Sequence, residues 1–172
     1  LPRGLFWARP LRGVWRTLLK AKREYLRAMR FDSAPRLERV RGRTFIALPS
    51  VFNPKIFRSS EFLARMMDSP LVPTNCEALD MGCGSGVGAV FAAQRAGKVT
   101  AADINPEAVR CARLNAALNR VEERCEFLES DVFDSLAGRR FDVVLFNPPF
   151  FVGAPKDAGD RAWRGVDVLA RF

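Results

Sequence analysis

The segment Ala78–Gly88, which reads A-L-D-M-G-C-G-S-G-V-G, constrains this chain more than any other. A short apolar run ends at Asp80, and an apolar run compatible with a helix, Ala89–Ala93, comes after the segment. Between them stand Gly82, Gly84, Gly86 and Gly88. Glycine accepts positive φ angles and, having no Cβ, lets backbone N–H groups approach a ligand. A strand, a glycine-rich turn and a helix in this order predict the opening of a nucleotide-binding α/β unit.

Strand and helix patterns alternate after this turn. We expect strands at Glu77–Asp80, Val99–Ala102, Cys125–Leu128 and Phe141–Phe146. The first helix is expected to close at Gly97 as its C′ residue. Asn105 and Pro106 are a suitable N-cap and first position for a helix that runs to about Asn119. The alternation predicts an α/β fold with a Rossmann-like sheet of parallel strands.

The segments upstream of the glycine turn predict a linker or turn at 32–39, a strand at Arg43–Leu48, and a helix that Ser59 or Ser60 caps and that ends near Met67. At the other end, a helix is expected from Val166 onward. The strand Phe141–Phe146 is apolar enough to be buried on both faces, and as the last of four strands it would form an exposed apolar edge. We therefore expect further C-terminal strands beyond Phe172.

Net charge divides the chain into two parts. The sequence has a net charge of +9, and residues 1–43 hold 13 basic and 3 acidic side chains. Within them, Val14–Arg30 has helical periodicity with an apolar and a basic face. We predict a basic helical N-terminal arm at 1–43 and a nucleotide-binding domain at 44–172 that is incomplete at its C-terminus. The basic face is compatible with RNA, the ribosome or an acidic membrane surface, or with an ordinary amphipathic helix packed on the domain.

Composition excludes several classes of protein. No apolar run approaches the roughly 18–20 residues of a membrane span, and no secretory signal sequence is visible. The chain has no histidine, and its cysteines, at 76, 83, 111 and 125, are not in C-x-x-C spacing. A metal site is therefore not expected. Scattered cysteines of this kind suit reduced core positions and a cytoplasmic protein.

Four polar residues follow the predicted strands at one edge of the sheet: Asp80, Asp103, Asp131 and Asn147. Ligands of open α/β sheets bind outside the carboxyl ends of the strands. Asp103 comes 21 residues after Gly82, where a carboxylate can bind ribose hydroxyls. By itself the glycine spacing also allows NAD. Asp103 and the polar residues at the other strand ends make this pattern more specific than the glycine spacing alone.

At these motifs the sequence resembles the class I S-adenosylmethionine-dependent methyltransferases. The matching stretches are D-M-G-C-G-S-G, A-D-I-N, S-D-V-F and N-P-P-F, in that order, within roughly residues 45–172. The last tetrad, Asn147-Pro148-Pro149-Phe150, resembles that of enzymes that methylate glutamine amides or the amino groups of adenine, cytosine and guanine. Val51-Phe52-x-Pro54 and the tail Arg161–Phe172 resemble the release-factor glutamine methyltransferases.

The resemblance implies S-adenosyl-L-methionine as cofactor and assigns residues to its parts. The loop Gly82–Gly86 would pass under the methionine moiety, and Asp103, next to Ile104, would bind the ribose. Asp131 would accept the adenine amino group, with Val132 or Phe133 against the ring. The alternative role for Asp131 is structural, as a helix N-cap or a turn residue.

The tetrad at 147–150 has a chemical rationale for methyl transfer to a planar amino group. Such a nitrogen is a poor nucleophile because its lone pair is delocalised. The Asn147 side-chain oxygen and the Pro148 carbonyl can each accept one N–H, which favours pyramidalisation of the nitrogen. Pro148 and Pro149 hold the backbone rigid, and Phe150 can stack on the substrate. Such catalysis depends on positioning and electrostatics and needs no histidine. Asn-Pro is otherwise a common β-turn.

Three functions are compatible with these observations. The first is methylation of a protein glutamine, with a release factor as the protein partner, which the tail resemblance favours. The second is methylation of an RNA or DNA base, which the basic residues 1–43 favour. The third is a cofactor-binding or interaction module without catalysis. Oligomeric state does not follow from the sequence.

Overall fold

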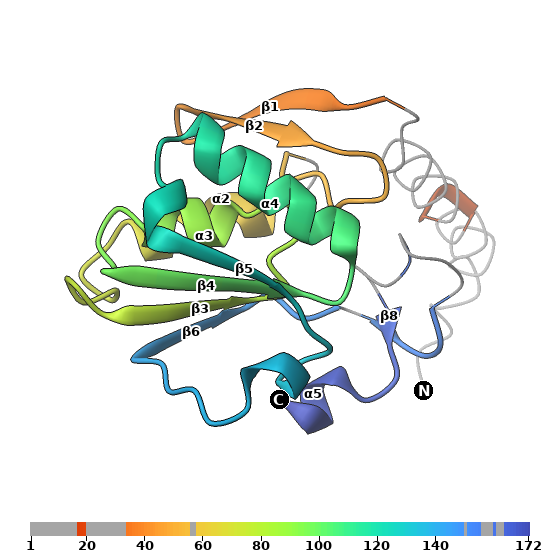
Figure 1. The fold of residues 1–172 in the computed structure, drawn as a ribbon. Helices are drawn as coiled ribbons and strands as arrows, with labels where there is room; N and C mark the ends of the chain where they lie inside the picture. The colour runs from red at the N-terminus through yellow and green to blue at the C-terminus, as the bar shows by residue number, and fades with distance from the viewer. Residues whose placement is uncertain (1–16, 20–33, 56–57, 150, 156–159, 161–163) are drawn as a thin grey trace, which may run out of the picture.

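A four-stranded parallel sheet forms the centre of the fold. The structure is a computed structural model, and it describes residues 17–19, 34–55, 58–149, 151–155, 160 and 164–172. The strands are β3 (Glu77–Met81), β4 (Lys98–Asp103), β5 (Cys125–Glu129) and β6 (Val143–Phe146), in the order β5-β4-β3-β6 (Figure 1). All neighbouring strands are parallel, which confirms the predicted α/β fold. Strands β4 and β5 follow on one side of β3, whereas β6 lies on its other side. The strand order therefore reverses at β3, and α/β sheets bind ligands at such a topological switch point.

Helices α2 (Arg58–Met67), α3 (Val87–Ala92) and α4 (Pro106–Leu118) lie on one side of the sheet (Figure 1). As predicted, Asn105 is the N-cap of α4: its side chain accepts a hydrogen bond from the Glu107 N–H over 3.1 Å. The opposite side carries a 3-10 turn, η2 (Asp134–Leu136), and α5 (Val168–Arg171). A second 3-10 turn, η1 (Glu122–Arg124), leads into β5.

Alternation along β3 divides the core between the two sides of the sheet. Ala78 belongs to the larger cluster, which the helices cover, whereas Leu79 and Met81 belong to the smaller cluster on the other face. Successive strand side chains point to opposite faces. Asp80 therefore lies on the same face as Ala78, beneath the start of α3.

An antiparallel hairpin precedes the sheet. It consists of β1 (Arg36–Val40) and β2 (Arg43–Ala47), and β2 packs against α4. The prediction of a linker or turn at 32–39 is wrong. Arg41 and Gly42 have φ angles of 46° and 82°, as a two-residue hairpin turn requires. Arg-Gly is not one of the common sequences for that turn, so the hairpin was not evident.

Two predicted helix ends are also wrong. Ser59 and Ser60 lie inside α2, so neither is its N-cap. Helix α3 ends at Ala92, and Gly97 is not its C′ residue. A Cβ at Gly97 would come within 3.0 Å of the Asn75 carbonyl oxygen. The glycine therefore permits a close backbone approach and does not cap the helix.

The edge of the sheet differs in part from expectation. The prediction that the fourth strand is buried on both faces is wrong, because the Val144 side chain in β6 is 41% exposed. Strand β6 lies at the edge of the described sheet, as expected for the last of four strands. After it, β7 (Phe151–Val152) pairs in parallel with β8 (Arg164–Gly165), and the expected terminal helix, α5, begins at Val168.

Most of the basic N-terminal segment is outside the described residues. Of the predicted helix Val14–Arg30, only residues 17–19 are described, and they are helical. The division of the chain at residues 43 and 44 stays a prediction. Among the helices that the structure describes, none has the length and apolar character needed to cross a membrane.

Candidate active site

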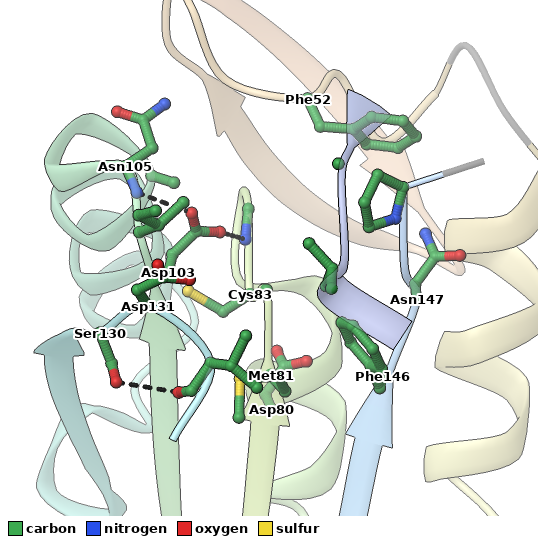
Figure 2. A pocket seen from close by; sticks show the side chains of 18 of the residues that line it. Phe52, Asp80, Met81, Cys83, Asp103, Asn105, Ser130, Asp131, Phe146 and Asn147 are labelled. Atoms are coloured by element: carbon green, nitrogen blue, oxygen red, sulfur yellow. Dashed lines mark hydrogen bonds between the residues drawn. The ribbon is translucent and has the colours of Figure 1, made fainter. Parts of the chain in front are cut away.

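A cavity of about 270 Å³ lies at the carboxyl ends of the strands (Figure 2). Asp103 and Asp131 stand on one side of it, Phe146 and Asn147 on the other, and Cys83 between them. Most of the predicted site residues line this cavity: Asp80, Gly82, Gly84, Asp103, Ile104, Asp131, Val132, Asn147 and Pro149. The topology thus brings the ends of β3, β4 and β6 and the loop after β5 to one place.

The glycine turn forms the floor between β3 and α3. Gly82, Gly84 and Gly86 all have positive φ angles, of 65°, 53° and 76°. The predicted residue Gly86 is not part of the cavity lining. A Cβ at Gly86 would lie 2.8 Å from Cα of Ala112, so this glycine lets the turn pack against α4.

Asp80 supports the turn from below. Its side chain is 3% exposed, and Oδ2 accepts a hydrogen bond from the Ala89 N–H over 2.7 Å. Burial raises the pKa of Asp80 to about 7, against the opposing effect of the Ala89 N–H. A Cβ at Gly88 would come within 2.6 Å of Asp80 Oδ1. A glycine at 88 is therefore required for the carboxylate to reach the start of the helix.

Asp103 joins three segments at the end of β4. Its Oδ2 accepts from the Gly84 N–H and its Oδ1 from the Asn105 N–H, both over 2.9 Å (Figure 2). Burial raises the pKa of Asp103, and the backbone N–H groups of Asn105, Gly84 and Ile104 oppose this shift. Each carboxylate oxygen has a second lone pair that can accept a hydroxyl proton. The geometry therefore suits the binding of ribose hydroxyls.

Asp131 is paired with the C-terminal helix. Its Oδ2 accepts a hydrogen bond from Nη1 of Arg171 over 3.0 Å, and Nη2 of Arg171 reaches Oδ1 of Asp134 at 3.5 Å. Next to this ion pair, Phe172 stacks on Phe146 and Phe133, with ring centroids 4.5 and 5.6 Å apart. The predicted residue Phe133 thus lies against Phe172 and is not part of the cavity lining.

Val132 has an unfavourable backbone conformation. Its φ angle is 51°, although β-branched residues rarely adopt the left-handed region. Such conformations cost roughly 1–3 kcal/mol and gather at functional sites. The Ser130 hydroxyl donates a hydrogen bond to the Val132 carbonyl oxygen over 2.9 Å (Figure 2).

The Asn147 side chain lines the cavity opposite Asp103. Within the part of the chain that the structure describes, its amide makes no hydrogen bond, which leaves it able to bind a substrate. Pro149 lines the cavity beside it, whereas the predicted residue Pro148 does not. The predicted residue Phe150 lies outside the described residues. Phe52, from the loop after β2, reaches the same side of the cavity.

Several lining residues were not assigned to the site from sequence: Met81, Ser130, Phe146 and Arg171. Met81 stands between Asp80 and Gly82, and Phe146 directly precedes Asn147, so proximity to a motif was a usable signal. For Arg171 the signal was weak, because its partner Asp131 is 40 residues away in the chain.

No metal-binding group of three or more histidine, cysteine or acidic residues exists among the described residues. All four cysteines are free thiols; Cys76, Cys83 and Cys111 are buried, as expected for core positions, whereas Cys125 is only partly buried. Burial, followed by the nearby Asp103, raises the pKa of Cys83 well above its usual value. Its thiol is therefore held in the neutral form at physiological pH.

The order of the strands, the glycine turn and the acids at the strand ends define a Rossmann-like fold of the S-adenosylmethionine-dependent methyltransferase class. Residues 42–164 match the methyltransferase small domain family. The chain belongs to this family.

Two curated relatives are named as glutamine methyltransferases. One, from Methanocaldococcus jannaschii, is provisionally named a protein N5-glutamine methyltransferase; it is 36% identical over 129 residues, which cover 70% of this chain and 64% of the relative. The other is a release factor glutamine methyltransferase from Koribacter versatilis, 37% identical over 147 residues, or 76% of this chain and 51% of the relative. This chain thus spans from half to just under two thirds of their lengths.

A solved structure with a similar fold is named as a methyltransferase of an RNA base. It is the T. thermophilus 16S rRNA N2 G1207 methyltransferase in complex with AdoMet and guanosine. The TM-score is 0.58 at 27% identity, over 70% of this chain and 34% of that one. Proteins similar to this chain thus include glutamine methyltransferases and a nucleobase methyltransferase.

Proposed function

We propose that this protein transfers the methyl group of S-adenosylmethionine to the side-chain amide of a glutamine in a protein substrate. The observation that carries the proposal is the position of Asn147, which faces the cavity across from Asp103. A methyl-acceptor group bound at Asn147 and a cofactor held by Asp103 would meet within one cavity. The two curated glutamine methyltransferases support this choice of acceptor.

The residues present fit the cofactor. Asp103 offers carboxylate lone pairs to the ribose, and the adjacent Ile104 offers an apolar surface at 36% exposure. The turn Gly82–Gly86 brings backbone close to the cavity, where a Cβ at Gly84 would already lie 3.8 Å from Cβ of Phe52. Asp131 and Val132 line the part of the cavity that we assign to adenine.

The bound cofactor would supply an electrophilic methyl group on a positively charged sulfur. The protein's part is to prepare the amide nitrogen. The Asn147 side-chain oxygen, which faces the cavity, would accept an N–H of the amide and turn its lone pair toward the methyl group. The second acceptor predicted from the sequence, the Pro148 carbonyl, lies outside the cavity lining and is not assigned to this step. On accepting the methyl group from the sulfur, the amide nitrogen would become cationic and would lose one proton to solvent. Positioning of this kind can supply much of the rate enhancement.

Methylation of an RNA base is the second candidate. The net charge of +10 in residues 1–43 favours it, since phosphate contacts dominate affinity for nucleic acid. The similarity to the rRNA methyltransferase structure also supports it. RNA binding through the arm should weaken steeply with salt and be lost on deletion of residues 1–43. RNA binding that survives this deletion would show that residues 1–43 are not needed to bind RNA.

The test is methyl transfer from S-adenosylmethionine with a tritiated methyl group to two acceptors, a glutamine-bearing protein fragment and RNA. We expect label in the protein fragment, as N5-methylglutamine by mass spectrometry. Label in RNA alone would replace the lead proposal by the second. Cofactor binding without transfer to either acceptor would favour a binding module.

A further inference from the structure

We propose that Ser130 is a positioning residue that keeps Val132 in its left-handed conformation and so fixes the adenine end of the cavity. The proposal rests on the proposed function in one respect: the cofactor must place its adenine at Asp131 and Val132. The link between Ser130 and Val132 depends only on geometry.

Ser130 is built into the structure by three hydrogen bonds. Its side chain, which is 4% exposed, donates to the Val132 carbonyl oxygen over 2.9 Å and accepts from the Ser135 N–H over 3.0 Å. Its backbone N–H donates to the Asp103 carbonyl oxygen over 3.0 Å. One small residue therefore connects the strained Val132 to the residue that we assign to the ribose.

Val132 needs such a restraint. Its φ angle of 51° is one that a β-branched residue leaves readily unless its surroundings prevent it. Its side chain is 7% exposed and packs with Leu79 and Met81, so burial fixes one side of the residue. The Ser130 hydroxyl fixes the other side, at the carbonyl group. A return to negative φ would reorient the Val132 N–H and the preceding Asp131 within the cavity.

A double-mutant cycle separates this role from ordinary loop stability. Its members are the wild type, Ser130→Ala, Val132→Gly and the double variant. Glycine adopts positive φ without cost, so the loss of the hydroxyl should matter less when residue 132 is glycine. The affinity for S-adenosylhomocysteine is measured by calorimetry, and the melting temperature is measured without ligand.

We expect Ser130→Ala to weaken binding about 10-fold with Val132 present and less than 3-fold in the Val132→Gly background. Ser130→Thr, which retains the hydroxyl, should restore affinity to within 3-fold of the wild type. Ser135→Ala is the matched control, because its hydroxyl binds the Glu129 carbonyl oxygen and not Val132; it should bind normally. The melting temperature should likewise fall less on Ser130→Ala when residue 132 is glycine.

Two results would overturn the proposal in distinguishable ways. Equal losses of affinity in both backgrounds would make Ser130 an ordinary loop residue and leave the proposed function intact. A wild type that binds no S-adenosylhomocysteine would overturn the proposed function and the adenine part of this proposal together. Non-additive melting temperatures would then still report the Ser130–Val132 link.

Discussion

The Gly84 N–H donates a 2.9 Å hydrogen bond to Oδ2 of Asp103, and this bond joins the glycine turn of β3 to the end of β4. Asp103 Oδ1 accepts from Asn105, the N-cap of α4, over the same distance. A single carboxylate thus sets the position of the turn, of the strand end and of the next helix. Its charge is available to a ligand because the cavity borders it.

Replacing Asp103 should weaken cofactor binding. Hydrogen bonds to a charged group contribute about 1.5–3 kcal/mol each, so Asp103→Ala should raise the Kd for S-adenosylmethionine by at least about 10-fold, measured by calorimetry. Glu129→Ala is a matched control, since Glu129 pairs with Asp103 in the sheet register but is exposed and lies outside the cavity lining. An unchanged Kd for Asp103→Ala would refute the ribose assignment.

Asp80 should make stability depend on pH. Burial raises its pKa to about 7 in the folded protein, whereas an unfolded chain has a value of about 3.9. The folded state therefore binds a proton that the unfolded state has released. The free energy of unfolding should decrease between about pH 4 and pH 7, by up to about 1.4 kcal/mol per pH unit, and level off above. Urea denaturation of the wild type and Asp80→Asn checks this: the variant should lack that slope, and parallel profiles would contradict the account.

Gly86 and Gly138 form a matched pair, because both have a φ angle of 76°. At either position, the left-handed backbone conformation would cost an alanine roughly 1–2 kcal/mol. A Cβ at Gly138 meets nothing within 4 Å, whereas one at Gly86 meets Ala112 at 2.8 Å. Gly86→Ala should therefore lose a further 1–3 kcal/mol or so from overpacking and weaken cofactor binding. Equal losses of unfolding free energy in the two variants would show that α4 does not confine the turn.

Arg171 should contribute to cofactor affinity through Asp131. Its guanidinium holds the Asp131 carboxylate at 3.0 Å, so Arg171→Gln should raise the Kd for S-adenosylhomocysteine about 3- to 10-fold. Arg110→Gln is the control, since Arg110 pairs with Glu107 on the surface of α4. Surface pairs contribute about 0–1 kcal/mol, and the control should bind normally. Equal affinities for both variants would show that Arg171 does not contribute to cofactor binding.

Much of the site could be predicted because strand periodicity and the glycine turn are local features. Asp80, Asp103 and Asn147 each directly follow or end an apolar strand, and parallel topology then places them together. The roles of Gly86 and Phe133 could not be assigned in the same way. Gly86 packs on Ala112 and Phe133 stacks on Phe172, and both contacts join segments distant in sequence.

The hairpin and the strained valine show the other limit of sequence reasoning. The turn at Arg41-Gly42 lacks the usual Asn or Asp, so most of β1 was predicted as a linker, whereas β2 was predicted correctly as a strand. The positive φ angle of Val132 contradicts its intrinsic preference and is imposed by Ser130 and by side-chain burial. Intrinsic propensity gives no indication of such a conformation, because part of its cause is the packing of Val132 against Leu79 and Met81 of β3.

The role proposed for Asn147 in catalysis can be measured by transfer of a tritiated methyl group. Wild type and Asn147→Ala are compared for N5-methylglutamine formation at saturating S-adenosylmethionine. We expect the variant to bind the cofactor within about 3-fold of the wild type but to lose at least about 100-fold in kcat, as for removal of a transition-state hydrogen-bonding group. Methylation by Asn147→Ala at the wild-type rate would show that Asn147 is not catalytic.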